Sequence, residues 1–180
     1  MSVIGEAAMA CGGDRVRGLG ISSQGEAFTP TGTPYFDTQV KGAILGLRLT
    51  TTRAEVLRAL LEGVAFEMRL NIDILDKSGI PMNELVAIGG GARDPLWTQL
   101  KADVLNKPIS TVAVTEAGCL GVAMLACAAV TQEDVRSLAG KWVHVTGQLR
   151  PDPDNAAYYG SRFQDYLKLY PAIRGLAPGS

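Results

Sequence analysis

Apolar side chains recur at intervals of three and four residues between positions 57 and 75, which is the spacing of one helix face. Thr52 and Glu55 have the T-x-x-E spacing of a capping box, so the helix is expected to begin directly after Thr52. Gly79 suits the left-handed position that follows a helix, and Pro81 prevents its continuation. The pattern predicts a helix of about 25 residues, roughly 38 Å long.

Strands and helices alternate in the segment that follows. Residues 85–88 form a short apolar run that predicts a strand, and Asp94-Pro95 has the pattern of an N-cap followed by the first helical residue. Residues 109–114 predict the next strand, and residues 117–130 a helix rich in small side chains. This order of strand, helix, strand and helix predicts parallel strand pairing with right-handed crossovers.

The remaining segments predict shorter elements. Residues 16–21 and 43–49 have the pattern of strands, and residues 131–138 that of a short helix. A short extended piece is expected over residues 142–145. Asp152-Pro153 opens a last helix, whose core-facing side chains are expected to be Tyr159, Phe163, Tyr166 and Tyr170.

Composition narrows the class of protein. The 180 residues are 47% hydrophobic and 19% charged, which is enough apolar material for the core of one domain, with a disordered tail expected only at residues 175–180. A net charge of −1 gives no electrostatic basis for binding nucleic acid or an anionic membrane. The longest apolar run, residues 119–130, is shorter than the ~20 residues that span a bilayer, so we expect a cytoplasmic protein.

The triple glycine Gly89, Gly90 and Gly91 is the first candidate site. Glycines that leave a strand and lead into a helix let a ligand approach bare main chain at the carboxyl end of a strand. Asp94 at the helix N-cap disfavours a polyphosphate on that helix end, so a neutral adenosine across the glycines is easier to accept. The alternative is a tight strand-to-helix turn with no ligand, which the residues alone leave equally open.

Other polar residues are weaker candidates. Gln24, Gly25 and Glu26 lie at the bend between the strand predicted over residues 16–21 and a second one predicted over residues 26–29. Their polar groups could bind sugar hydroxyls there, although a polar hairpin turn explains them as well. The single histidine, His144, has no partner for a catalytic triad or a metal site. Cationic side chains on the predicted helices, at Arg53, Arg58, Arg69 and Lys101, are expected to be solvated.

Three stretches together resemble one family. Residues 42–62 match, position by position, the second signature of the FGGY carbohydrate kinases. Residues 88–97, which contain the triple glycine, look like the adenosine motif of that family, and residues 116–123 resemble its E-A-x-x-L-G-x-A helix start. The resemblance covers residues 34–174, which would form the C-terminal lobe of such a kinase.

The resemblance implies an α/β fold, namely an actin-like ATPase lobe of the ribonuclease-H-like type with a mixed sheet flanked by helices and a long central helix. It implies ATP as cofactor, with Mg²⁺ carried by the nucleotide, and transfer of a phosphoryl group from ATP to a sugar hydroxyl. Adenosine would be held by Gly89, Gly90, Gly91, Ala92 and Asp94.

Residues 1–33 resemble a short remnant of the N-terminal lobe of the family. Within it, Gln24, Gly25 and Glu26 fall where the family contacts sugar. The D-x-G-T phosphate motif of that lobe is absent from this sequence, and no aspartate matches the context of the catalytic base. The resemblance therefore assigns no catalytic and no metal-binding residue to this chain, and we expect a deleted or fragmentary kinase that is inactive by itself.

Two further interpretations stay open. A kinase lobe could serve as a non-catalytic interaction subunit, and an exposed cleft face would then leave room for a homodimer. Another actin-like enzyme, such as an acetate kinase or a ROK-type sugar kinase, fits less well because the signature over residues 42–62 is specific to FGGY kinases. The expected small-molecule partners are a nucleotide and a sugar.

Overall fold

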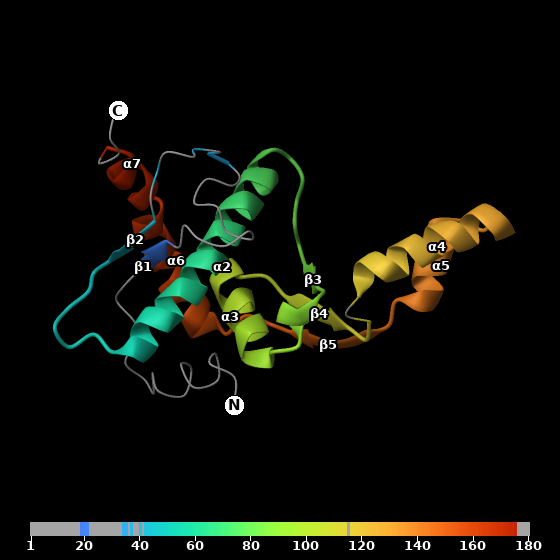
Figure 1. Ribbon diagram of the computed structural model, residues 1–180, viewed down its shortest axis with the longest axis horizontal. Helices are drawn as coiled ribbons and strands as arrows, with labels where there is room; N and C mark the ends of the chain where they lie inside the picture. Colours follow the sequence, from blue (N-terminus) through green and yellow to red (C-terminus); the bar gives the residue numbers. More distant parts are fainter. Residues whose placement is uncertain are drawn as a thin grey trace.

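The computed structural model describes residues 19–21, 34–35, 37, 40, 42–114 and 116–175. Figure 1 shows a body of helices and a small sheet, from which a pair of helices projects as an arm. Residues 1–18, residues 22–33 and the tail from residue 176 onward lie outside the described residues.

The long helix α2, Arg53–Lys77, runs through the centre of the body (Figure 1). The predicted capping box is confirmed, since the Glu55 main-chain N–H donates to Thr52 Oγ1 at 3.3 Å and Thr52 N–H donates to Glu55 Oε2 at 2.6 Å. The main-chain N–H of Thr52, together with its hydroxyl group, which donates to the same oxygen at 2.8 Å, lowers the pKa of the Glu55 carboxyl. The helix ends at Lys77, and Gly79 follows with a φ of 84°, as its position in the sequence predicts.

A three-stranded sheet in the order β3-β4-β5 lies beside this helix. Strands β3, Leu85–Ala87, and β4, Ile109–Val112, are parallel, and α3, Pro95–Leu105, connects them as the sequence predicts. Strand β5, Val145–Leu149, pairs antiparallel with β4 and makes the sheet mixed. A separate two-stranded ribbon joins β1, Leu19–Ile21, to β2, Ala43–Leu45.

Two apolar clusters hold the body together. The first joins α2, α3 and α6, Pro153–Tyr166, around Phe66, Tyr159 and Phe163, which are at most 2% exposed. The second packs α2 and α3 against one face of the sheet. Leu85 and Ala87 point into that cluster, whereas Val86 between them is 53% exposed, because successive side chains of a strand face opposite ways.

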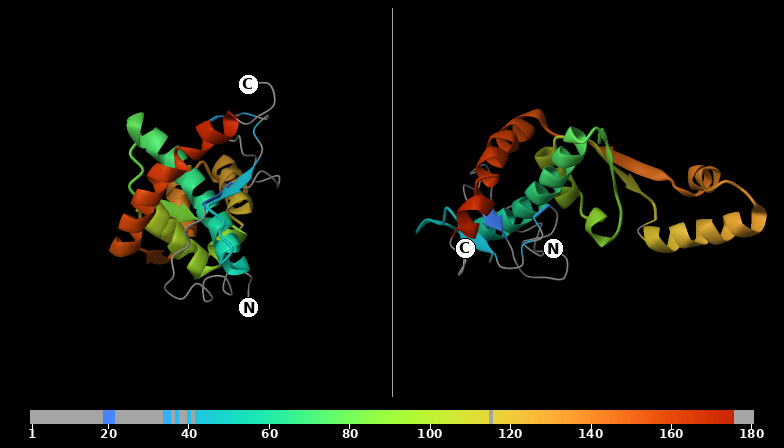
Figure 2. Two further views of the ribbon diagram at one scale, coloured as in Figure 1. Left: turned by 90° about the vertical axis from the view of Figure 1, so that its left-hand side faces the viewer. Right: turned by 90° about the horizontal axis from the view of Figure 1, so that it is seen from above.

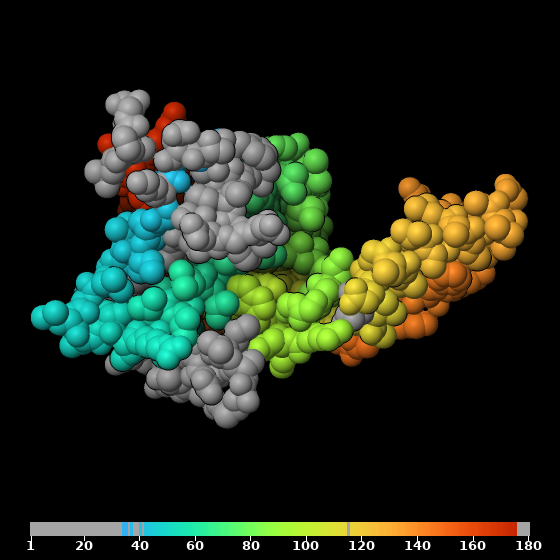
Figure 3. Space-filling model, viewed as in Figure 1, coloured from blue at the N-terminus to red at the C-terminus, as the bar shows by residue number. Residues whose placement is uncertain are grey.

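The arm consists of α4, Ala117–Thr131, and α5, Val135–Trp142, and it projects away from the body (Figure 2 and Figure 3). It is attached through the ends of β4 and β5, which reach toward it from the sheet (Figure 2). Met124 is the buried residue of α4, and Leu138 that of α5. The arm is therefore a helical hairpin with a very small core of its own.

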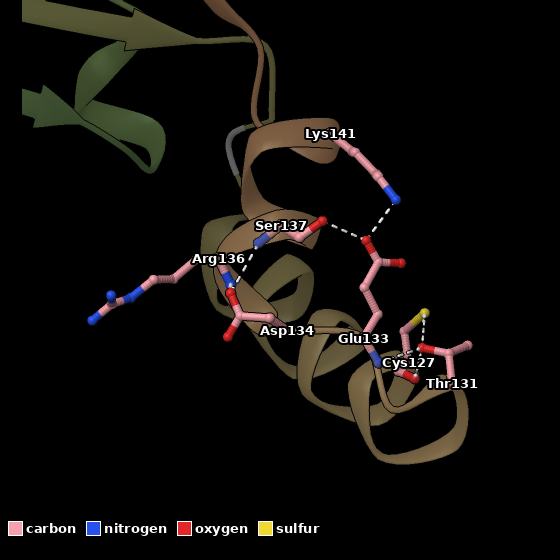
Figure 4. Close-up of polar contacts among 7 residues, drawn as sticks. All are labelled: Cys127, Thr131, Glu133, Asp134, Arg136, Ser137 and Lys141. Carbon is pink, nitrogen blue, oxygen red and sulfur yellow. Dashed lines mark hydrogen bonds and ion pairs between the residues drawn. The ribbon is translucent and has the colours of Figure 1, made fainter.

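Polar contacts fix the turn between these two helices (Figure 4). Glu133 Oε1 accepts hydrogen bonds from Ser137 Oγ at 2.6 Å and from Lys141 Nζ at 2.5 Å, and these bonds lower the pKa of the Glu133 carboxyl. Asp134 caps α5 by accepting from the main-chain N–H groups of Arg136 and Ser137 at 3.0 and 3.3 Å.

Several predicted boundaries are wrong. The strand expected over residues 43–49 ends at Leu45, because Gly46 adopts a φ of 81°. The short helix expected over residues 131–138 is α5 instead, since Gln132 is left-handed and ends α4. The extended piece expected over residues 142–145 is displaced to β5.

The last predicted helix is interrupted. It ends at Tyr166, and α7, Leu169–Arg174, follows as a separate element that carries Tyr170. The start of α6 is confirmed, because Asp152 accepts from Asp154 N–H and Asn155 N–H at 3.0 Å and Pro153 is the first helical residue.

Candidate functional site

The triple glycine forms the connection between β3 and α3. Gly89 has φ 80° and ψ −175°, a conformation that only glycine adopts without strain. Residues Gly90–Ala92 then make one turn of 3₁₀ helix, η1, in which Ala92 N–H donates to the Gly89 carbonyl at 3.1 Å and Arg93 N–H to the Gly90 carbonyl at 3.2 Å. The sequence therefore needs glycine at position 89 for the backbone itself.

A pocket of about 330 Å³ opens beside this turn. Its walls come from the turn, from the carboxyl end of β4 and from β5, so it lies where the two parallel strands of the sheet end. Ligands of open α/β sheets bind at such strand ends. The residues that line it are Ala87, Ile88, Gly89, Ala92, Arg93, Pro95, Thr111, Val112, Val114, Thr146 and Leu149.

The lining is apolar apart from one charge and two hydroxyl groups. Arg93 is the single charged residue among those that line the pocket. Thr111 and Thr146 face each other across β4 and β5, with their Oγ1 atoms 3.1 Å apart, and either can donate. A flat, largely apolar group could lie against such walls, and an anion could be balanced by Arg93.

Asp94 satisfies the start of α3. Its Oδ1 accepts from the N–H groups of Leu96 at 2.9 Å and Trp97 at 3.2 Å, and its carbonyl accepts from Thr98 Oγ1 at 2.9 Å. Thr98 is fully buried. Because a carboxylate already occupies the donors of this helix end, a phosphate has no open place there.

On its other side the glycine turn faces side chains of α3. A methyl group added at Gly91 would lie 3.7 Å from Trp97 Nε1 and 3.8 Å from Lys101 Nζ. Lys101 in turn stacks over the Trp97 ring, with Nζ 4.4 Å from the ring centroid. Burial lowers the pKa of Lys101, and the carboxylate of Asp94 opposes that shift.

The structure thus distributes the predicted adenosine residues over several environments. Gly89 and Ala92 line the pocket, Gly90 faces open space, Gly91 faces Trp97, and Asp94 caps α3. Their nucleotide contacts stay a prediction. The predicted sugar-binding residues Gln24, Gly25 and Glu26 lie outside the described residues.

Sequence reasoning missed two of the pocket walls. Thr111 and Thr146 are 35 positions apart, and only the antiparallel pairing of β4 with β5 brings them together. The segment that carries Thr146, Val145–Leu149, has only its two terminal residues apolar, so it gives little signal of a strand.

Two arginines that we expected to be solvated are partly buried and bonded. Arg58 donates to Glu62 Oε1 at 2.9 Å and to the Tyr159 hydroxyl at 3.0 Å, and Tyr159 donates to the same Glu62 oxygen at 2.8 Å. Burial raises the pKa of Glu62, which is 3% exposed, although both bonds oppose the shift. Arg69 donates to the Val104 carbonyl at 2.9 Å and lies over the Phe163 ring.

These residues link α2 to α6 and α3 inside the body, away from the pocket lining. Within the described ranges, no group of three or more histidine, cysteine, aspartate or glutamate side chains could hold a metal ion. None of the helices in the part of the chain that the structure describes is long and apolar enough to cross a membrane.

Comparisons with known proteins point to one family. Residues 26–130 match the model of the FGGY family of carbohydrate kinases, C-terminal domain. The chain is 29% identical over 155 residues to a xylulose kinase of Staphylococcus xylosus, which covers 83% of this chain and 32% of that protein. It is 40% identical over 118 residues to glycerol kinase 2 of Saccharolobus solfataricus, with 64% and 24% covered.

Solved structures agree on the fold. A xylulose kinase from Rhodospirillum rubrum superimposes with a TM-score of 0.76 at 25% identity, over 97% of this chain and 34% of that one. A gluconate kinase from Lactobacillus acidophilus gives a TM-score of 0.80 at 23% identity, over 94% and 34%. The expected actin-like α/β lobe is confirmed, and the chain spans about a third of the length of these relatives.

Proposed function

Because this chain belongs to the FGGY family of carbohydrate kinases, we propose that it is the nucleotide-binding lobe of an ATP-dependent sugar kinase. In the complete reaction the γ-phosphoryl group of ATP, with Mg²⁺ on the phosphates, would pass to a sugar hydroxyl. This lobe contributes the adenosine site.

One observation carries the proposal, namely the pocket of about 330 Å³ beside bare main chain at the ends of β3 and β4. At Gly90 an added methyl group would meet no atom within 4 Å, so the space above the turn is open to a ligand. The apolar walls suit a nucleobase, and the hydroxyls of Thr111 and Thr146 offer donors and acceptors to its edge.

Charge sets the direction of the nucleotide. Asp94 occupies the donors at the start of α3, so the phosphates extend away from that helix end. Arg93 supplies positive charge at the pocket. Adenosine therefore contributes most of the contacts of this lobe, and ADP and ATP should bind it with similar, weak affinity.

Isothermal titration calorimetry with adenosine, ADP and ATP tests this proposal. We expect all three to bind the purified chain. Gly90→Ala should weaken binding about tenfold, because its methyl group enters the space of the ligand while it meets nothing in the free protein.

Gly140→Ala is the matched control. Gly140 lies in α5 and, like Gly90, has open space around an added methyl group, but it is on the arm and not on the glycine turn that borders the pocket. The affinity of this variant for the three ligands should equal that of the wild type. Absence of any heat of binding with all three ligands at millimolar concentration would refute the site, and equal affinity of Gly90→Ala would refute its place on the turn.

We further propose that this chain alone transfers no phosphoryl group to a sugar. The D-x-G-T motif is absent from the sequence, and no aspartate matches the context of the family's base. A coupled assay for ADP, with a panel of pentoses, gluconate and glycerol as acceptors, should give no rate above that without acceptor. Sugar-dependent ATP consumption by the pure protein would overturn this statement.

A second function, self-association, is favoured by the surface of the arm. Val122, Leu125 and Val130 of α4 are 68%, 61% and 85% exposed, and the helix carries no charged residue. An uncharged apolar surface of this kind is typical of a protein–protein interface. Under this hypothesis the chain docks as a subunit, and two copies pair through α4.

Size-exclusion chromatography with light scattering separates this hypothesis from the first. A dimer that dissociates in the double variant Val122→Gln, Leu125→Gln would support pairing through α4. A wild-type monomer at all concentrations would exclude it, and nucleotide binding by that monomer would leave the first function intact.

A further inference from the structure

We propose that Trp97 is a positioning residue that holds the glycine turn in the shape that nucleotide binding requires. The inference rests on the proposed nucleotide function and assigns a role to a residue outside the pocket lining. Trp97 acts through Gly91, on the side of the turn that faces the body.

Two of the three glycines in the turn have no side chain close to the position of a Cβ atom. Added methyl groups at Gly89 and Gly90 would meet no atom within 4 Å. A methyl group added at Gly91 would have Nε1 and Cδ1 of Trp97 and Nζ of Lys101 as its nearest atoms, at 3.7 to 3.8 Å. Of the three glycines, Gly91 alone therefore faces nearby side chains, and those side chains are Trp97 and Lys101.

The indole ring is itself held from several sides. Trp97 is partly buried against the cluster that contains Phe66 and Phe163, so the core fixes one side of the ring. Lys101 covers a ring face at 4.4 Å from the centroid. The main chain of Trp97 is tied to the Asp94 cap. A ring held in this way beside Gly91 limits how far the turn can move toward the body.

Hydrogen exchange in the absence of nucleotide measures this role directly. The amides of Ala92 and Arg93 close the turn through bonds to Gly89 and Gly90. Trp97→Ala should raise their exchange rates about tenfold or more, as read by NMR. Trp97→Phe retains a ring against the core and should restore most of the protection.

Leu100→Ala is the matched control. Leu100 lies on the same helix and packs against the same cluster as Trp97, but none of its atoms is among the three nearest to a methyl group added at Gly91. It should lower global stability without a selective effect on Ala92 and Arg93. The inference is overturned if Trp97→Ala leaves these two amides unchanged, or if Leu100→Ala exposes them equally.

Nucleotide titration then connects the turn to the ligand. The chain has two tryptophans, so Trp142→Phe in the arm leaves Trp97 as the sole indole. Its emission should change saturably with ADP, and Trp97→Ala should weaken ADP binding about tenfold in calorimetry, with Trp97→Phe within threefold.

The two levels of the proposal fail differently. Selective exposure of the turn in Trp97→Ala without ADP binding to any variant would refute the nucleotide function and retain the structural role. ADP binding that is equal in wild type and Trp97→Ala would refute the positioning role and retain the nucleotide site.

Discussion

The central helix α2 and the arm helix α4 use apolar residues in opposite ways. Helix α4 contains no charged side chain, yet Met124 is its one buried residue. Helix α2 is rich in charged residues and buries seven of its 25 positions, among them Phe66 and Leu70. The more polar helix, α2, therefore has the larger number of buried residues.

The apolar composition of a helix does not by itself show how much of its surface is buried, because burial depends on which neighbouring elements pack against it. In α2 the apolar residues form one stripe, which α3 and α6 bury. In α4 they surround the helix, and α5 covers only part of them. The comparison predicts that packing in the body determines the free energy of unfolding, whereas the exposed apolar surface of the arm is available for contacts with another protein.

The largest effect is expected in the body. Phe66→Ala removes a fully buried ring that stacks with Phe163 and Tyr166, and it should cost about 3–5 kcal/mol in free energy of unfolding. Urea denaturation followed by circular dichroism measures it. Leu125→Ala in the arm should cost less than about 0.5 kcal/mol. A similar loss of unfolding free energy in both variants would contradict the proposed difference between body and arm.

The next effect concerns the buried carboxylate of the body. Glu62→Ala leaves the Tyr159 hydroxyl without its acceptor and Arg58 with the Tyr159 oxygen alone, and it should cost about 1–3 kcal/mol. Denaturant unfolding at neutral pH is the measurement. No loss of stability would mean that this contact between α2 and α6 is dispensable.

Glu62→Gln gives the same site a pH test. Burial raises the pKa of Glu62 above its usual value of 4.5, so in that range the folded chain binds more protons than the unfolded chain. Its contribution to stability is therefore greatest at low pH and is lost as the pH rises above about 4.5. Glu62→Gln should flatten this part of the stability curve, and a slope equal to that of the wild type would contradict the assignment.

A smaller effect should stay inside the arm. Asp134→Ala removes the cap of α5 and should cost that helix about 1 kcal/mol. Hydrogen exchange should increase over residues 135–142 and remain unchanged in α2 and α3. Thr52→Ala, which removes the cap of α2, is the counterpart in the body, and it should shift the global unfolding transition. A global shift from Asp134→Ala would show that the arm unfolds together with the body.

The smallest effect on stability is expected on the outer surface of α4. Val122→Gln and Leu125→Gln alter side chains that are 68% and 61% exposed, so unfolding should change by less than about 0.5 kcal/mol. Differential scanning calorimetry checks this expectation. A loss above about 1 kcal/mol would mean that these side chains are covered within the monomer.

Local chemistry predicted the starts of helices well. The bonds of Thr52, Asp94 and Asp152 to nearby main-chain groups lie within a few residues, so the sequence alone locates α2, α3 and α6. The parallel pairing of β3 with β4 follows from the order of elements. The start of α5 was missed, although Asp134 is a cap of the same kind, because the left-handed conformation of Gln132, which no local signal predicts, ends α4 and delays the next helix to Val135.

The site was predicted only in its local part. The glycine turn is a contiguous signal, and its place at the end of β3 followed from the sequence. The opposite wall depends on the register of β5 against β4, which includes an irregularity between Thr111 and Val112 and has no local signature. The stacking of Lys101 on Trp97 was also missed. Spacing along a helix shows on which face a charged side chain lies, but it does not show which neighbour its aliphatic part packs against.

One contact at the edge of the body bears on how this unit can be joined to others. The Tyr35 and Tyr170 rings stack with centroids 3.7 Å apart, and the Tyr170 hydroxyl donates to Asp37 at 2.9 Å. The polypeptide between these tyrosines thus enters and leaves at a single point. A module whose two ends meet can be spliced into a longer host protein, or re-cut into a circular permutant, with little disturbance of its interior.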